Sequence, residues 1–215
     1  VGLFIGAAAI VLSVSVLNGF QGILQTETKK IYGDYLVEDI SNAGFFNDLN
    51  IDNENYSIFK ENEFLIVSNK KQNLIEFKSV SNESLNDFYE LDLQNNLEAL
   101  SNEEVIIGNL LANRLNVGIG DSIQLISKDF KLNSYSLPDI YEFRVANIFS
   151  NRILRANDFL VFGVNKEIFK KANLSVEING NIGSIKDSST TLLSWKDRNR
   201  QLFEATEIEK KITFF

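Results

Sequence analysis

The chain contains no histidine, no cysteine and no methionine, and it has one proline and one tryptophan among 215 residues. The lack of histidine and cysteine excludes Ser-His and Cys-His nucleophile pairs, zinc sites of imidazole or thiolate, and disulfide frameworks. Basic residues are fewer than acidic ones: the chain has 21 Lys and Arg and 29 Asp and Glu, which gives a net charge of −8. Such a chain has no basic field to gather phosphates, so we expect no nucleic-acid partner.

The remaining residues follow no motif of a catalytic, metal or nucleotide site. Gly118 and Gly120 lack the third glycine and the Lys-Ser/Thr pair of a phosphate loop, and they precede an expected strand instead of a helix. The acidic residues do not follow the spacing of a calcium loop. We therefore predict that this chain is not an enzyme and holds no metal and no cofactor.

The first residues form the longest apolar run. Residues 1–17 (VGLFIGAAAIVLSVSVL) are apolar apart from two serines, and no charged side chain precedes Glu27. At about 1.5 Å per residue the run covers roughly 25 Å of the ~30 Å hydrocarbon core of a bilayer, so we expect a transmembrane helix that begins upstream. A signal peptide and a buried core helix are the alternatives.

The last residues predict a second long helix. Residues 194–197 (SWKD) have the form of a capping box, with Asp in place of the usual Glu or Gln. Apolar residues then recur at helical spacing. We expect this helix to lead into a second span, so that residues of about 27–210 form a soluble domain between two membrane helices. An ordinary surface helix is the alternative.

Alternation of apolar and polar residues predicts a strand-rich domain between these helices. Residues 83–100 are acidic and rich in asparagine and are expected to form loops and turns. A hairpin turn is expected at residues 70–73, and a tight turn at 117–121. The expected strands are 35–40, 56–60, 63–68, 74–80, 122–127, 142–149, 158–164, 175–178 and 190–195, and the expected helices are 110–115 and 166–172.

Four blocks of sequence resemble one family, the permease subunits of the lipoprotein-releasing ABC transporter (the LolC/LolE group). They resemble, in order, "LSVMNGF", "V-I-L-G-x-x-L-A-x-x-L-G-V-x-x-G-D", "F-x-V-x-G-x-F" and a "W … L-F-x-A-x-x-x-E-K" approach to the second span. Asn116 and Asn147 stand where the family usually has glycine. The matching blocks are residues 13–20 (SVSVLNGF), 105–121 (VIIGNLLANRLNVGIGD), 143–149 (FRVANIF) and 195–211 (WKDRNRQLFEATEIEKK).

The resemblance implies an α+β fold, in which an extracytoplasmic domain has a porter-like α/β part and an inserted, mostly β, Sabre-like part, flanked by transmembrane and stalk helices. Residues 1–32 would be the first span and its stalk, and 196–215 the stalk helix that leads to the second span. Residues 33–63 and 173–195 would form the porter-like part, and 64–172 the Sabre-like insertion.

The resemblance also implies a function. Such a permease extracts lipoproteins from the inner membrane and passes them to a periplasmic carrier by mechanotransmission, with most of this chain in the periplasm. Its expected partners are a second permease subunit, membrane lipid, and a cytoplasmic ATPase dimer that holds the ATP and Mg. The alternatives are a MacB- or FtsX-type permease with another cargo or role, and a membrane-tethered ectodomain without transport.

Three sets of residues are candidates for this function. In the family, the connection at residues 128–141 carries a hook for the carrier, and its apolar side chains either form that hook or fold back on the core. Residues at the outer end of the first span either contact the lipoprotein or pack against the second span. Trp195 either locks the stalk or is an ordinary core residue, and Tyr32 and Gly33 form the opposite joint. The predicted sets are Phe130, Leu132, Tyr135, Leu137, Pro138 and Ile140 for the carrier, Val14, Val16, Leu17 and Phe20 for the lipoprotein, and Trp195, Leu202 and Phe203 for stalk coupling.

Overall fold

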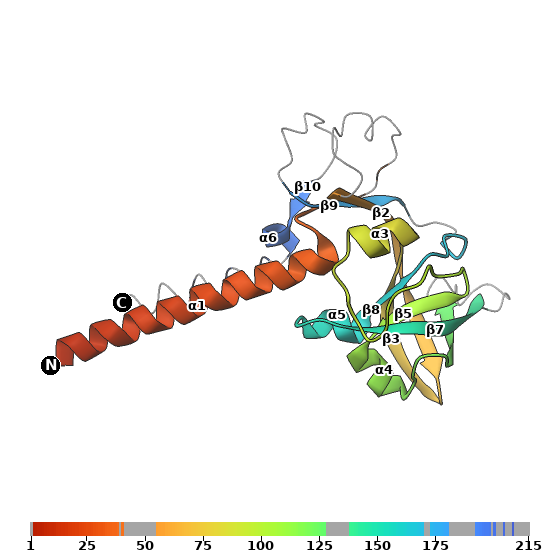
Figure 1. Ribbon diagram of the computed structural model, residues 1–215, viewed down its shortest axis with the longest axis horizontal. Helices are drawn as coiled ribbons and strands as arrows, with labels where there is room; N and C mark the ends of the chain where they lie inside the picture. Colours follow the sequence, from red (N-terminus) through yellow and green to blue (C-terminus); the bar gives the residue numbers. More distant parts are fainter. Residues whose placement is uncertain are drawn as a thin grey trace.

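A long helix, α1, projects from a strand-rich body in the computed structural model of the chain (Figure 1). The structure describes residues 2–38, 40, 55–127, 138–169, 173–180, 192–198, 200, 204 and 208. Its elements are α1 (Gly2–Tyr32), β1 (Tyr35–Val37), β2 (Tyr56–Ser68), β3 (Lys71–Ser79), α3 (Asn82–Asp87), β4 (Asp92–Leu93), β5 (Glu104–Gly108), α4 (Asn109–Leu115), β6 (Ser122–Ser127), β7 (Ile140–Ser150), α5 (Leu154–Phe159), β8 (Leu160–Gly163), β9 (Ser175–Ile178), β10 (Leu192–Ser194) and α6 (Trp195–Arg198).

Six strands form a closed ring in the order β2, β3, β8, β5, β7 and β6, because β6 pairs with both β7 and β2. The β3–β8 and β5–β7 pairs are parallel, and the other pairs in the ring are antiparallel. Closure leaves the ring without exposed strand edges. All six strands lie between residues 56 and 163, so this part of the body has its own sheet and core.

A second group of strands adjoins the ring through β2. The first residues of β2 pair with β9, and β1 lies between β9 and β10. The strands β1, β9 and β10 come from the segments 33–63 and 173–195, which therefore meet in space although they are far apart in sequence. The assignment of the two parts to porter-like and Sabre-like types stays a prediction.

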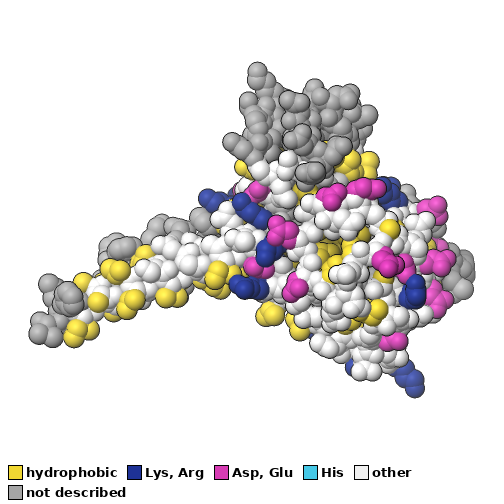
Figure 2. Space-filling model, in the orientation of Figure 1, with side chains coloured by type: hydrophobic (Ala, Val, Ile, Leu, Met, Phe, Trp, Pro, Cys, Tyr) yellow, Lys and Arg dark blue, Asp and Glu magenta, His cyan; other side chains and the backbone are white. Residues whose placement is uncertain are grey.

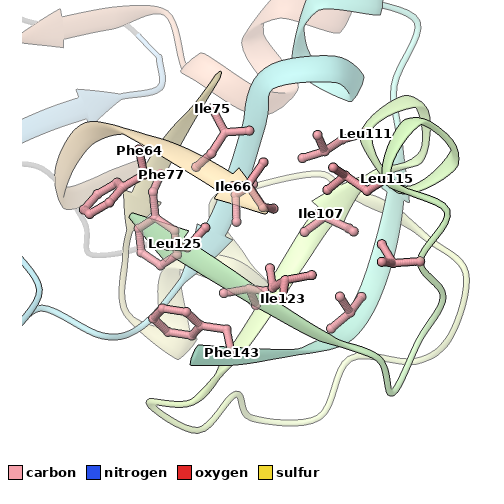
Figure 3. Packing of buried hydrophobic residues seen from close by; sticks show 14 of the residues in the cluster. Phe64, Ile66, Ile75, Phe77, Ile107, Leu111, Leu115, Ile123, Leu125 and Phe143 are labelled. Atoms are coloured by element: carbon pink, nitrogen blue, oxygen red, sulfur yellow. The ribbon is translucent and has the colours of Figure 1, made fainter. Parts of the chain in front are cut away.

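Two hydrophobic cores lie on opposite sides of the ring wall. The inner core takes side chains from all six strands of the ring and from α4, and Phe64, Phe77 and Phe143 are among them (Figure 3). The outer core includes Ile106 and Ile31, the latter near the end of α1. Since successive side chains of a strand point to opposite faces, Val105 and Ile107 enter the inner core while Ile106 enters the outer one.

Local structure departs from the sequence expectation in several places. Residues 56–68 form one continuous strand instead of two. The hairpin turn is at Asn69 and Lys70, both with positive φ, so it begins one residue before the expected turn and overlaps it at Lys70. A short helix, α3, lies in the stretch expected to be loop, because Ser81 caps it by accepting a hydrogen bond from the Ser84 N–H at 3.1 Å. The described residues 166–169 form a turn instead of the expected helix.

The two asparagines that replace family glycines have different roles. Asn116 ends α4 in the left-handed conformation, with φ 57°, which asparagine tolerates better than most residues. Asn147 is buried next to an irregularity in the β5–β7 pairing. Its side chain donates to the Asn95 carbonyl at 2.8 Å and accepts from the Asn95 N–H at 3.3 Å, so it ties β7 to the segment that follows β4.

Candidate functional site

The end of α1 meets the body at a junction with α6, β3, β9 and the residue Tyr89 that follows α3. Helix α1 is long and apolar enough to cross a membrane, and the candidate span is Ile5–Tyr32. Beyond it, Gly33 has φ +62°, and its N–H donates to the Lys29 carbonyl at 3.0 Å. A Cβ atom at Gly33 would lie 3.1 Å from the Ile178 carbonyl oxygen and 3.1 Å from Phe88, so only glycine fits this turn without strain.

A fully buried ion pair lies at the centre of this junction. Lys78 on β3 and Glu177 on β9 have no exposed side-chain surface, and Lys78 Nζ lies 2.7 Å from Glu177 Oε1. The Tyr89 hydroxyl donates to the other carboxylate oxygen, Oε2, at 2.8 Å. Both oxygens of the buried carboxylate therefore have partners, which is the condition under which a buried charge is tolerated.

Aromatic rings surround the buried ammonium group. Lys78 Nζ lies 4.2 Å from the ring centroid of Phe59, 5.1 Å from that of Tyr32 and 5.6 Å from that of Tyr89. These distances are in the range of cation–π interactions. Burial, and next the charge of Glu177, raise the pKa of the Tyr89 hydroxyl well above its ordinary value, so Tyr89 remains a hydrogen-bond donor throughout the physiological range.

Arg198 connects α6 to both α1 and the ion pair. Its Nη1 donates to the Tyr32 carbonyl at 2.9 Å and lies 3.4 Å from Glu177 Oε1, and its guanidinium carbon lies 4.8 Å from the Tyr32 ring centroid. One side chain thus contacts the last residue of α1 and the buried carboxylate of β9. The ends of the two helices are held together through the body.

The predicted capping box at the start of α6 is confirmed. The Asp197 N–H donates to Ser194 Oγ at 3.3 Å, and the Ser194 N–H donates to Asp197 Oδ2 at 3.0 Å. The hydrogen bond from the Ser194 hydroxyl, followed by that from its backbone, lowers the pKa of Asp197. Trp195 is half-buried, and its N–H donates to the Asp34 carbonyl at 2.9 Å, so the start of α6 lies beside Gly33, the residue after α1.

A carboxyl pair and a cleft adjoin the junction. Glu61 lies opposite Lys78 in the β2–β3 ladder. Burial, together with the charges of Glu76 and Glu177 and a hydrogen bond to Glu76, raises the pKa of Glu61 to about 7, although Lys78 opposes this shift. A cleft of about 220 Å³ opens here between α1 and the body, lined by Leu24, Thr28, Tyr32, Glu76, Ile153, Arg155 and Arg198.

The polar contacts of the junction hold secondary-structure elements together. It joins two helices, two strands and a loop by charge-assisted hydrogen bonds, which are directional and therefore fix the angles between elements. Among the residues that the structure describes, no group of three or more His, Cys, Asp or Glu side chains could hold a metal ion. The arrangement is suited to holding elements rigidly in place.

The predicted lipoprotein-binding residues all lie on α1, but not on one narrow stripe. Val16 is 69% exposed and Phe20 is 48% exposed, one helical turn apart, whereas Val14 and Leu17 are half-buried on another side. Figure 2 shows hydrophobic side chains along the helix surface outside the body. This placement does not test lipoprotein contact, which stays a prediction.

The predicted carrier-binding and stalk residues lie only partly within the described structure. Pro138 is half-buried, and Ile140 at the start of β7 is 57% exposed. Trp195 lies at the junction, as described above. The other predicted residues, Phe130, Leu132, Tyr135, Leu137, Leu202 and Phe203, lie outside the described residues.

Four residues at the centre of the junction belong to no predicted site: Lys78, Tyr89, Glu177 and Arg198. The alternation along β3 places Lys78 on the face opposite the inner core, which in isolation predicts exposure. In the structure that face is covered by the end of α1. A signal was present in Glu177, a single charged residue between Val176 and Ile178 in a short strand.

Comparisons with known proteins support the family resemblance. No family model matches the chain. The lipoprotein-releasing system transmembrane protein LolC of Buchnera aphidicola subsp. Schizaphis graminum is 25% identical over 100% of this chain, and that of subsp. Acyrthosiphon pisum is 24% identical over 100%. The chain spans 59% of the length of each of these relatives.

Among solved structures, the periplasmic region of MacB from Actinobacillus actinomycetemcomitans has 12% sequence identity and a TM-score of 0.46, over 82% of this chain and 95% of that one.

The two LolC matches cover the whole chain, including the four sequence blocks. They confirm the resemblance: this chain is LolC-like along its whole length and is similar to ABC permeases of the lipoprotein-releasing system.

Proposed function

We propose that this chain is part of a permease subunit that extracts lipoproteins from the inner membrane and passes them to a periplasmic carrier. The observation that carries the proposal is the similarity of the whole chain to two proteins named LolC. In this proposal α1 crosses the inner membrane and the strand-rich body lies in the periplasm. ATP hydrolysis belongs to a cytoplasmic ATPase dimer, which works with this chain and a second permease subunit.

The junction supports transmission of force through the two helices. Helix α1 is continuous from its apolar part to Tyr32, where its last carbonyl binds Arg198 of α6. A displacement of either helix therefore reaches the other helix and the buried Glu177 through hydrogen bonds to one side chain. In the proposal, ATP-driven movement of the spans is passed through this junction to the body.

The body and the outer part of α1 would then contact cargo and carrier. Val14, Val16, Leu17 and Phe20 would contact the acyl chains, and Pro138 and Ile140 would lie at the edge of the carrier-docking loop. The side chain of Ile140 is 57% exposed and is therefore accessible to a carrier. The alternatives are transport of another cargo and an ectodomain without transport.

Reconstitution of the full permease pair with its ATPase in proteoliposomes tests the proposal. We expect ATP-dependent transfer of a lipoprotein to its carrier, and no transfer would contradict the proposed cargo. Arg198→Met should keep ATP hydrolysis and reduce transfer per ATP, because it removes the link between α1 and α6. Arg200→Met, at an exposed position two residues after Arg198, is the matched control and should transfer normally. Equal transfer by both variants would show that Arg198 does not transmit force.

A further inference from the structure

The segment of residues 151–155, here called the loop, comprises the connection before α5 and the first two residues of that helix, and it lies beside the point where α1 becomes charged. Glu27 is the first charged residue of α1, and Arg152 Nε lies 3.9 Å from its Oε1 atom. Figure 1 shows α5 on the side of the body next to α1. If α1 crosses a bilayer, this loop is therefore the part of the body that meets the membrane surface.

The composition of the loop suits a membrane surface. Leu154 is 71% exposed, the largest exposed fraction among the large hydrophobic side chains of the described residues. It lies between Arg152, whose side chain is 73% exposed, and the exposed Arg155. An exposed apolar side chain can insert into the membrane interface, and arginines beside it are attracted to anionic lipid.

The loop is also held in a fixed shape by buried hydrogen bonds. Asn157 is 3% exposed, and its Oδ1 accepts from the Asn151 N–H at 2.7 Å while its amide donates to the Asn151 carbonyl. Asn151 Oδ1 accepts in turn from the Ile153 N–H at 2.7 Å. The half-buried Ile153 packs against the outer core. The Leu154 side chain therefore points outward from a loop that is already ordered, so binding through this side chain requires no further loss of backbone conformational entropy.

We propose that this loop binds the membrane, with Leu154 among the lipid glycerol and acyl groups and Arg152 and Arg155 on the phosphates of anionic phospholipids. The proposal rests on the membrane placement of α1 in the proposed function. Basic side chains lie around the base of α1, interleaved with acidic ones (Figure 2). Glu27 offsets part of this local charge, because it also lies 3.2 Å from Lys30. The loop fixes the tilt of the body on the bilayer, as a second contact beside α1.

The absence of cysteine allows a direct test by labelling single introduced cysteines with a fluorophore. The full chain is reconstituted in nanodiscs of phosphatidylcholine with or without phosphatidylglycerol, and quenching by lipids with a nitroxide near the headgroup is measured. The labelled positions are Leu154→Cys, Ile140→Cys and Val11→Cys. Ile140 is the matched control, because it is 57% exposed and β7 separates it from the loop by roughly 30 Å.

We expect quenching at Leu154 and none at Ile140, with stronger quenching in the presence of phosphatidylglycerol. Arg152→Gln together with Arg155→Gln should abolish that difference between the two lipid mixtures. Equal signals at Leu154 and Ile140 would overturn the proposal, as would an unchanged lipid dependence in the double variant. Val11→Cys reports separately on the span, because nitroxides at the bilayer centre should quench its fluorophore. No quenching at Val11→Cys would contradict the membrane placement of α1. Quenching at Val11→Cys without quenching at Leu154→Cys would contradict only the membrane contact of the loop.

Discussion

The buried ion pair at the junction predicts a large and asymmetric response to mutation. In Glu177→Gln the Lys78 ammonium keeps its aromatic neighbours and the Glu61 carboxyl group opposite it in the β2–β3 ladder, but it loses the carboxylate that lies 2.7 Å away. In Lys78→Met the Glu177 carboxylate keeps Tyr89 at 2.8 Å and Arg198 at 3.4 Å. Removing one partner of a buried pair typically costs 3–5 kcal/mol because the other charge stays buried, so about this loss is expected for Glu177→Gln. We expect a smaller loss for Lys78→Met, since its partner retains a cation.

Urea unfolding of the chain in detergent micelles measures these free energies. Circular dichroism follows the strands, and the single tryptophan, Trp195, reports on the junction itself. The matched control is Arg144→Met, which breaks the ion pair with Glu104 at a side chain that is 62% exposed, where losses are about 0–1 kcal/mol. A loss for Glu177→Gln no larger than that of the control would refute the reasoning. So would a larger loss for Lys78→Met than for Glu177→Gln.

Three further predictions concern single residues. The raised pKa of Glu61 means that the native state holds a proton which the unfolded chain releases. The free energy of unfolding should therefore fall as the pH rises from about 4.5 to about 7, by up to about 3 kcal/mol. The urea midpoint should vary less with pH across this range in Glu61→Gln. Gly33→Ala should lose about 1–2 kcal/mol to its positive φ and its 3.1 Å contacts, whereas Gly22→Ala, with no atom near its Cβ, should not lose stability. Asn147→Ala should lose about 1–3 kcal/mol, because it leaves the Asn95 N–H and carbonyl without their partner. Faster hydrogen exchange at the Asn95 amide would show that the loss of stability arises at this contact.

The sequence predicted the features that depend on neighbouring residues. The uncharged first 26 residues predicted the long apolar helix, and the SWKD segment predicted the capping box with the correct partners. The tight turn before β6 was also expected, and the Gly118 N–H donates to Asp121 Oδ2 at 2.8 Å there. In each case the chemistry lies within a few positions of the chain, where spacing alone determines geometry.

The sequence did not predict the features that depend on distant segments. The polar stretch in the middle of β2 indicated a break between two strands, but the strand continues because its partner changes there from β9 to β3 and β6. Closure of the ring likewise depends on β6 meeting β2, and no local pattern encodes that meeting. Periodicity states which side chains share a face of a strand. It does not state what covers that face.

Lys78 shows the consequence of this limit for the junction. Its neighbour Phe77 enters the inner core, so alternation places Lys78 on the outer face of the ring. That face is exposed to water in most single sheets, and it is buried here because α1, Tyr89 and Glu177 converge on it from three other parts of the chain. Local sequence patterns predicted only residues beside this buried centre of the junction, namely Trp195, Tyr32 and Gly33.

The choice of a buried ion pair for this junction is itself informative. Replacement of such a pair by apolar residues of similar volume is often neutral or stabilising, so stability alone does not require Lys78 and Glu177. Apolar packing is not directional, and it allows surfaces to slide. Charge-assisted hydrogen bonds hold angles as well as contacts, and a joint that passes displacement between helices needs fixed angles. The double variant Lys78→Met with Glu177→Leu separates these roles, because we expect it to fold at least as stably as either single variant.

The reconstituted transporter then provides the decisive measurement on this double variant. The variant keeps the apolar volume of the junction but gives Arg198 no carboxylate, so α6 retains only the Tyr32 carbonyl and ring as partners of that side chain. We expect unchanged ATP hydrolysis and reduced lipoprotein transfer per ATP. Normal transfer by a stable double variant would show that packing alone couples the helices to the body, and that the ion pair is not needed for transmission.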